Sequence, residues 1–438
     1  MKGTACRFSC QAMVVALLVG ACLSLRCDED PVSPGYNWQA VQDAWWILDV
    51  YFIFRDQLPA GPEDFSDPVT LFESVDEPWT NYYSHELATR YVAYMSTERG
   101  GIGILLDSVA SGVLIEQVFA GSPGEQAGLL AGDTIVAVSG QNTAGVPMET
   151  VTEWLGGEVG ETKILVVRRD DGDHTITVTL GTYLAPSVFT DSLDSTIAYI
   201  ALSVFSQTTI DSAGSWGEFR DALEQTAWAD YTILDLRDNG GGSVSQCLDI
   251  TGEFVPVNTP VIRSREREYV SSGDSGRTID TTWYTSQAGV AGQRKVYVLV
   301  DDYTASASEL LLSCLREQRS DIVSVGITTY GKARSQYVFG YDWEEQVYYL
   351  ADRGLATVTF SLLSPVSGVG YDLTGITPDH VTATSEEALD RAIALIRVEQ
   401  GGGITKSLAV RRKLDYLERA RMAIGPEIRR PLAVYDLH

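Results

Sequence analysis

Apolar positions at helical spacing mark the first structured part of the chain. Between Trp38 and about Phe54 apolar side chains recur roughly every three to four residues, and Ser84 to Met95 repeats the pattern. Two amphipathic helices close together predict a small helical N-terminal domain, residues 37–97. Within it, the stretch from Asp76 to Tyr83 is interpreted as structural.

Short β-like runs replace the helical pattern over residues 98–183. They are separated by glycine-containing turns, which is typical of a small β domain. The expected strands and the one expected helix are Val113 to Val118, Thr134 to Val138, Lys163 to Arg168, Thr175 to Leu180, and a helix near Met148 to Leu155.

Apolar strands alternate with helices over residues 184–399. The expected strands are Ile197 to Ala201, Tyr231 to Leu236, Val296 to Val300 and Asp321 to Gly326; the expected helices are Ser215 to Thr226, Val244 to Phe254, Ser308 to Gln318 and Glu386 to Ile396. This order predicts an α/β core of βα units with a largely parallel sheet, which binds ligands beyond the carboxyl ends of its strands. Residues 400–438 form a tail with a basic, helical centre and no predicted function.

The first 22 residues have the pattern of an export signal. Lys2 and Arg7 precede the apolar run Ala12 to Ala21, which is too short to span a bilayer comfortably. The run ends at Cys22 in Val-Gly-Ala-Cys, which resembles a bacterial lipobox and predicts a lipid on this cysteine, followed by a polar tether over residues 23–36. An ordinary cleaved signal peptide or an uncleaved anchor remain alternatives. The predicted location is the bacterial cell envelope, lipid-anchored and facing the periplasm or the cell exterior.

Charge and cysteine usage exclude several classes of site. A formal charge of -27, from 32 basic and 59 acidic residues, disfavours nucleic-acid binding. Four of the six cysteines precede residue 28, and no disulfide framework or metal-binding CxxC motif is present, so neither a metal nor another cofactor is expected. Cys247 and Cys314 could pair, although free buried thiols are the commoner state in apolar helices.

Two loops at expected strand ends carry candidate chemistry. After one strand comes Arg237-Asp238-Asn239-Gly240-Gly241-Gly242, whose glycines allow close approach of backbone N–H groups to a ligand; the alternative is a flexible turn. After another, Ser306 opens a helix. Ser306 and Glu309 fit a capping box, so this serine could simply cap the helix. A nucleophile in the same place would lie beside free N–H donors that favour an oxyanion.

A serine nucleophile needs a base, and the four histidines are scattered at positions 85, 174, 380 and 438 without a triad motif. Lys332 is the alternative, since lysine serves as base in some serine triads. Half-neutral lysine at pH 7 requires its pKa to fall by about 3.4 units, which burial can supply. If its segment is a strand, Lys332, Arg334 and Gln336 share one face. Gln336 could then orient the amine and Arg334 could lower its pKa; a surface lysine is the alternative.

Five motifs occur in an order that resembles the carboxyl-terminal processing (tail-specific) peptidases, over roughly residues 70–398. They are the PDZ-like stretch of residues 98–183, Asp-Leu-Arg-x-Asn-x-Gly-Gly from Asp235, Ser-Ala-Ser-Glu from Ser306, Tyr-Gly-Lys-x-x-x-Gln from Tyr330, and Gly-Ile-Thr-Pro-Asp from Gly375. The resemblance implies a PDZ β-barrel before or inserted in a ClpP/crotonase-like α/β catalytic core. Ala333 and Gly240 depart from the family, which usually has glycine and proline there.

The resemblance also implies roles for individual residues. Ser306 corresponds to the nucleophile, Lys332 to the general base and Gln336 to its orienting partner, and the oxyanion hole corresponds to the Ala307 amide with Gly241 and Gly242. In the PDZ domain, the loop Gly101-Ile102-Gly103-Ile104 corresponds to the site that receives a terminal carboxylate while the tail adds a strand to the sheet.

The resulting hypothesis is an exported, lipid-anchored serine endopeptidase that cleaves proteins after recognising their C-terminal tails, with a Ser/Lys mechanism. Its partners would be protein or peptide substrates with free C-termini, and an adaptor or an oligomer stays open. The main alternative is a non-catalytic PDZ lipoprotein of the same fold. A trypsin-like PDZ protease lacks its histidine, aspartate and nucleophile loop here, and the PDZ and lysine motifs disfavour an acyl-CoA enzyme on a related scaffold.

Overall fold

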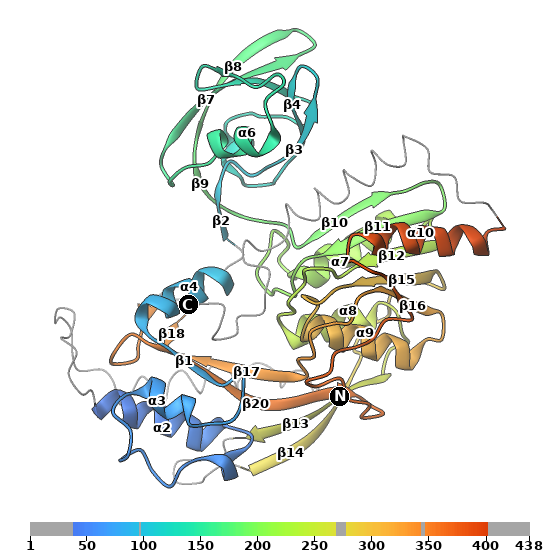
Figure 1. Cartoon of the computed structure of the whole chain (residues 1–438). Helices are drawn as coiled ribbons and strands as arrows, with labels where there is room; N and C mark the ends of the chain where they lie inside the picture. Colours follow the sequence, from blue (N-terminus) through green and yellow to red (C-terminus); the bar gives the residue numbers. More distant parts are fainter. Residues whose placement is uncertain (1–37, 96–97, 269–276, 343–346, 402–438) are drawn as a thin grey trace, which may run out of the picture.

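A computed structural model describes residues 38–95, 98–268, 277–342 and 347–401 (Figure 1). The predicted signal peptide, the lipid site at Cys22, the tether and nearly all of the C-terminal tail lie outside these residues. Within the described ranges, no helix combines the length and apolar composition needed to cross a bilayer.

The larger core is a six-stranded sheet in the order β10-β11-β12-β15-β16-β21. All its pairings are parallel except the antiparallel pair at one edge, β10 with β11. The strands are β10 (Val188–Ser192), β11 (Ile197–Leu202), β12 (Tyr231–Asp235), β15 (Lys295–Val300), β16 (Ile322–Gly326) and β21 (His380–Val381). The largely parallel α/β core expected from the sequence is therefore confirmed.

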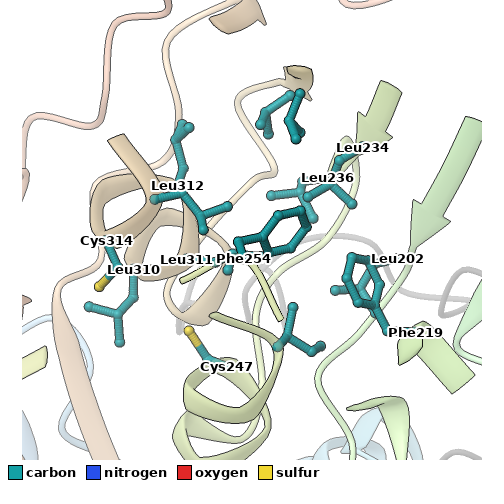
Figure 2. Close-up of a cluster of buried hydrophobic side chains, with 14 of the residues drawn as sticks. Leu202, Phe219, Leu234, Leu236, Cys247, Phe254, Leu310, Leu311, Leu312 and Cys314 are labelled. Carbon is teal, nitrogen blue, oxygen red and sulfur yellow. The ribbon is translucent and has the colours of Figure 1, made fainter. Parts of the chain in front are cut away.

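Helices cover both faces of this sheet, as parallel strands buried on both sides require. They are α7 (Ser215–Gln225), α8 (Val244–Gly252), α9 (Ala307–Gln318) and α10 (Glu387–Glu399). α7, α8 and α9 bury one face around Leu234 and Val298, and α10 buries the other around Ile233 and Tyr297. Figure 2 shows α9 leucines packed with Phe254 in the first cluster. Cys247 and Cys314 lie there as free, buried thiols.

A second, antiparallel sheet holds strands from distant parts of the chain. Its order is β1-β20-β13-β14, with β17 also paired to β20. Its strands are β1 (Asn81–Tyr83), β13 (Pro260–Glu268), β14 (Arg277–Tyr284), β17 (Arg334–Phe339) and β20 (Leu355–Pro365), and a small hairpin adds β18 (Tyr341–Asp342) and β19 (Val347–Tyr348).

The N-terminal helices pack on this second sheet. They are α2 (Trp38–Tyr51), η1 (Arg55–Gln57), α3 (Pro68–Glu73) and α4 (His85–Met95). Val41 and Leu48 of α2 share a core with Ala356 and Val358 of β20, so the helical N-terminal segment and the later strands bury one another's apolar side chains.

The β-rich domain contains a sheet in the order β3-β4-β5-β7-β8, with β6 paired to β5. Its elements are β3 (Ile104–Val109), β4 (Gly112–Val118), α5 (Pro123–Gln126), β5 (Thr134–Val138), β6 (Gln141–Asn142), α6 (Met148–Leu155), β7 (Thr162–Arg169) and β8 (Gly172–Thr179). β2 (Glu98–Gly101) and β9 (Gly181–Leu184) pair as a ribbon at its base (Figure 1). Leu105 and Phe119 join the same apolar cluster as Phe189 of β10, which attaches this domain to the α/β core.

Candidate active site

Two loops at the carboxyl ends of β12 and β15 meet because these strands are parallel neighbours, with Asp235 opposite Leu299. The buried residue Asn239 ties the loops together. Its carbonyl accepts hydrogen bonds from the Ala305 N–H at 3.1 Å and the Ser308 hydroxyl at 2.9 Å. The glycine loop and the serine loop therefore have fixed relative positions.

Asp301 makes a second link between the same loops. Its buried carboxylate accepts hydrogen bonds from the backbone N–H groups of Asp238, at 3.0 Å, and Thr304, at 2.9 Å. Burial, with the nearby negative charge of Asp238, raises the pKa of Asp301 to about 6. The carboxylate is charged at neutral pH, where it can hold both loops.

Ser306 lies at the sharp turn into α9. Its φ of 55° and ψ of -116° are unusual for a non-glycine residue, and such conformations persist where surrounding contacts hold them. The backbone N–H of Ser306 donates to Glu309 Oε2 at 3.0 Å. The next N–H, that of Ala307, opens the helix and has no acceptor among the described residues. It is free to receive a ligand oxygen at the positive end of the helix dipole.

Gly241 and Gly242 of the neighbouring loop have different surroundings. Gly241 has a φ of 103°, and a Cβ added there would lie 2.7 Å from Ser306 Cβ. Its N–H donates to Asn239 Oδ1 at 2.9 Å and is not open. Gly242 packs against the Phe205 backbone, while its own N–H has no acceptor within the described ranges. Of the three groups suggested for an oxyanion hole, the structure leaves the N–H groups of Gly242 and Ala307 available, and Gly241 provides the close approach to Ser306.

Lys332 lies in the irregular segment between β16 and β17, where the chain passes from one sheet to the other. Its backbone N–H donates to Glu309 Oε2 at 2.8 Å. The side chain keeps a little exposed surface but is densely surrounded by protein. This desolvation lowers the pKa of Lys332 to about 8, against the opposing influence of the carboxylates of Glu77 and Glu309. A substantial neutral fraction therefore exists near neutral pH.

The structure departs from the expected strand geometry around Lys332. β17 begins only at Arg334, and a bulge shifts the register between Ser335 and Gln336, so alternation does not place Lys332, Arg334 and Gln336 on one face. Gln336 Nε2 donates to Thr359 Oγ1 at 3.3 Å and makes no hydrogen bond to Lys332 among the described residues.

Arg334 also acts differently from the expectation that it repels the lysine. Its guanidinium pairs with Asp372 at 2.8 Å and Glu77 at 2.9 Å, so its charge is compensated. Burial is the cause of the lowered pKa of Lys332.

Glu309 is the site residue whose importance the capping-box pattern only partly indicated. Its side chain is fully buried, and burial raises its pKa. Oε2 accepts from the N–H groups of Ser306 and Lys332, and Oε1 accepts from the Gly331 N–H at 2.7 Å and the Thr329 hydroxyl at 2.5 Å. Glu309 therefore caps the helix and also binds the backbone of the lysine loop. The capping-box pattern predicts only the first of these contacts.

The loop Gly101 to Ile104 joins β2 to β3 in the β-rich domain. The Ile102 carbonyl accepts from Gly124 N–H at 2.7 Å, and the Gly103 carbonyl accepts from Phe119 N–H at 2.9 Å. The N–H groups of Ile102 and Gly103 have no acceptor in the described part of the chain. Gly103 has a φ of 77°, and a Cβ there would lie 2.3 Å from Ser122 Cβ. The loop thus offers open backbone donors, as a carboxylate site needs.

Comparison with known families identifies both folded parts. Residues 196–382 match peptidase family S41, and residues 114–169 match a PDZ domain. The α/β core therefore carries a peptidase S41 domain, and the β-rich part carries a PDZ domain. These matches confirm the family resemblance and the serine-type peptidase inferred from the motifs.

Individual relatives within this family are distant. The carboxy-terminal processing protease CtpA of Bacillus subtilis is 28% identical over 273 residues, which cover 62% of this chain and 55% of that protein. A carboxyl-terminal-processing protease of Synechocystis is 29% identical over 360 residues, covering 75% and 79%. The crystal structure of a protein from Bacteroides fragilis assigned to the S41 proteases has a TM-score of 0.51 and 18% identity, covering 85% of this chain and 99% of that chain, and it confirms the fold.

Proposed function

We propose that this S41 peptidase is an exported, lipid-anchored endopeptidase that cleaves proteins after capturing their C-terminal tails, with Ser306 as nucleophile and Lys332 as general base. One observation carries the mechanism. The buried carboxylate of Glu309 binds the backbone of the serine loop and of the lysine loop at once. Such an arrangement supports two reacting groups whose relative positions must be maintained.

In the proposed reaction, Ser306 Oγ attacks the carbon of the scissile carbonyl while Lys332 Nζ takes the hydroxyl proton. The N–H groups of Gly242 and Ala307 hold the oxyanion of the tetrahedral intermediate. Lys332 then gives the proton to the departing amine nitrogen, leaving an ester on Ser306. Water then gives a proton to Lys332 and attacks the ester carbonyl; the Ser306 oxygen leaves and takes this proton back from Lys332, which releases the acid and restores the serine.

Lys332 suits the role of base because of its surroundings. The pKa of about 8 leaves roughly a tenth of the amine neutral at pH 7, whereas an ordinary lysine would have well under a thousandth. A base with a pKa near the working pH combines a useful neutral fraction with adequate basicity.

Tail capture is proposed for the loop Gly101 to Ile104. Its open N–H groups at Ile102 and Gly103 fit a terminal carboxylate, and a bound tail would pair with an adjacent strand. The names of the two relatives, carboxy-terminal and carboxyl-terminal-processing proteases, agree with substrates that are recognised by their ends.

Export and lipid anchoring rest on the sequence of residues 1–22, with Cys22 as the lipidated residue and the bacterial cell envelope as the location. Replacement of Cys22 by serine should release the protein from the membrane fraction and leave the peptidase active. Unchanged fractionation, with no lipid on the wild-type protein, would contradict the anchor.

The activity is tested with unstructured peptides that differ only in their last three residues, with products mapped by mass spectrometry. Internal cleavage that depends on the tail and disappears in Ser306→Ala supports the proposal. Cleavage by Ser306→Ala at the wild-type rate would show that another residue is the nucleophile.

A further inference from the structure

Glu77 carries a carboxylate deep in the molecule, far along the chain from the serine and lysine loops. Its side chain is fully buried. Oε1 accepts from Arg334 Nη1 at 2.9 Å, and Oε2 accepts from the Thr359 hydroxyl at 2.8 Å and the Trp79 N–H at 3.2 Å. Glu77 thus connects the segment between α3 and β1 to β17 and β20.

Arg334 is held on several sides in this arrangement. Its guanidinium lies over the ring of Trp79, at 4.9 Å from the centroid, and over that of Phe54, at 5.2 Å. Asp372 Oδ2 forms an ion pair with Arg334 Nη2 at 2.8 Å. Cation–π contacts and two ion pairs fix an arginine that lies two residues after Lys332.

Gln336 is reached from the same carboxylate through one intermediate. The Thr359 hydroxyl donates to Glu77 and accepts from Gln336 Nε2 at 3.3 Å. The position of Gln336 along β17 is therefore coupled to Glu77, although a bulge separates it from Arg334.

We propose that Glu77 is a positioning residue for the peptidase reaction: it holds the start of β17 through Arg334 and Thr359, and its negative charge sets the pH range over which Lys332 can act as base. This rests on the proposed Ser/Lys function. Glu77 lies in the stretch from Asp76 to Tyr83, which was interpreted from the sequence as structural. The proposal gives this stretch a part in catalysis.

The charged groups around the lysine decide the sign of the effect. Glu77 and Glu309 both raise the pKa of Lys332 and oppose the larger effect of burial. Arg334 compensates part of the charge of Glu77, and Asp372 lies on the far side of Arg334. Tyr371, buried near Glu309 and Asp372, stays neutral because burial raises its pKa.

The test measures the pH dependence of kcat/KM for one quenched peptide with a free C-terminus. Wild type should reach half of its plateau near pH 8. Glu77→Gln should move this midpoint down by about half a unit to one unit, because an anion that favours the ammonium form is lost. Arg334→Gln should move it up by a similar amount, because the charge of Glu77 is then uncompensated. Both variants should also lower the plateau.

Asp76→Asn is the matched control, since it removes the same charge from the exposed neighbouring residue and should keep the wild-type midpoint. Glu77→Asp retains the negative charge, so its midpoint should also stay at the wild-type value. Circular dichroism checks folding, and if Glu77→Gln does not fold, the upward shift in Arg334→Gln decides.

Equal loss of activity at every pH, with unmoved midpoints, would assign Glu77 to stability alone and overturn the proposal, as would failure of both variants to fold. These outcomes differ from failure of the proposed function, in which Lys332→Ala itself would cleave the peptide like wild type.

Discussion

The backbone N–H groups of Ser306 and Lys332 donate to the same oxygen, Glu309 Oε2, at 3.0 and 2.8 Å. The serine follows a strand of the parallel sheet, whereas the lysine precedes β17 of the antiparallel sheet. One buried carboxylate thus joins two sheets at the point where the proposed nucleophile and base belong. A small shift of either loop would misplace a reacting group, and such misplacement can cost about 100-fold in rate.

Replacement of Glu309 by glutamine tests this link. The shape is retained, but one of the two oxygens becomes an NH₂ group that cannot accept hydrogen bonds, so two buried donors lose their partner. We expect kcat/KM to fall about 10-fold to 100-fold and the free energy of unfolding to fall by about 1 to 3 kcal/mol. Glu317→Gln, on the exposed side of the same helix, should change neither by much. Wild-type kcat/KM in Glu309→Gln would show that the carboxylate does not position the site.

Lys332→Met should separate activity from stability. Loss of the proposed base should lower kcat/KM by about 100-fold to 10,000-fold. Stability at pH 7 should rise, because a charged amine no longer has to be buried.

The pH dependence of this gain has a definite sign. In the folded protein the pKa of Lys332 is about 8, below the value of about 10.4 for an unfolded chain. The unfolded state therefore binds more protons between these values, and wild-type stability rises with pH in that window. The advantage of Lys332→Met should be largest below pH 8 and vanish near pH 10.4. Denaturant unfolding at several pH values measures it, and a variant that is less stable than wild type at pH 7 would contradict a costly buried charge.

Gly241→Ala tests the contact between the glycine loop and the serine. The new methyl group would lie 2.7 Å from Ser306 Cβ and 2.8 Å from Ala307 N, so the turn has to shift and the proposed oxyanion donors with it. We expect kcat/KM to fall at least about 100-fold. Gly292→Ala shares the positive φ but meets no atom within 4 Å, so it should cost about 1 kcal/mol of stability and no activity. Equal activities of the two variants would show that the close approach is unimportant.

The α/β core was predictable because its elements have strong local patterns. β12 and α9 occur close to where apolar runs and helical spacing place them. The second sheet was not predictable in this way. β20 pairs with β1, β13 and β17, which lie in separate parts of the chain. Pairing between strands that are distant in the sequence produces no pattern within either strand that could predict it.

The site residues also differ in how far the sequence could predict their positions. Ser306 and the glycine loop follow strands whose ends are visible in the sequence, so their neighbourhood could be expected. The bulge before Gln336 and the distant partner Glu77 of Arg334 could not, because both depend on pairing across more than 20 residues. Repulsion by Arg334 was expected to lower the pKa of Lys332, but Glu77 and Asp372 compensate the guanidinium and burial is the main cause.

The last prediction concerns recognition of substrate tails by the PDZ domain. A free terminal carboxylate would accept hydrogen bonds from the open N–H groups of Ile102 and Gly103, and an amidated tail loses the charge and an acceptor. A hydrogen bond to a charged group is worth about 1.5 to 3 kcal/mol, so the acid peptide should have a kcat/KM roughly 10-fold to 150-fold higher than its amide.

Gly103→Ala should reduce this acid-to-amide ratio, because its methyl group meets Ser122 Cβ at 2.3 Å and displaces the loop. Gly121→Ala is the control in the same domain, since it shares a positive φ and meets nothing within 4 Å, so it should keep the wild-type ratio.

The point substitution is preferable to deletion of the domain, because Leu105 and Phe119 share a core with the catalytic domain and their loss would expose it. Equal kcat/KM for acid and amide peptides on the wild-type enzyme would remove the case for carboxylate capture, while the assignments of Ser306 and Lys332 would stand.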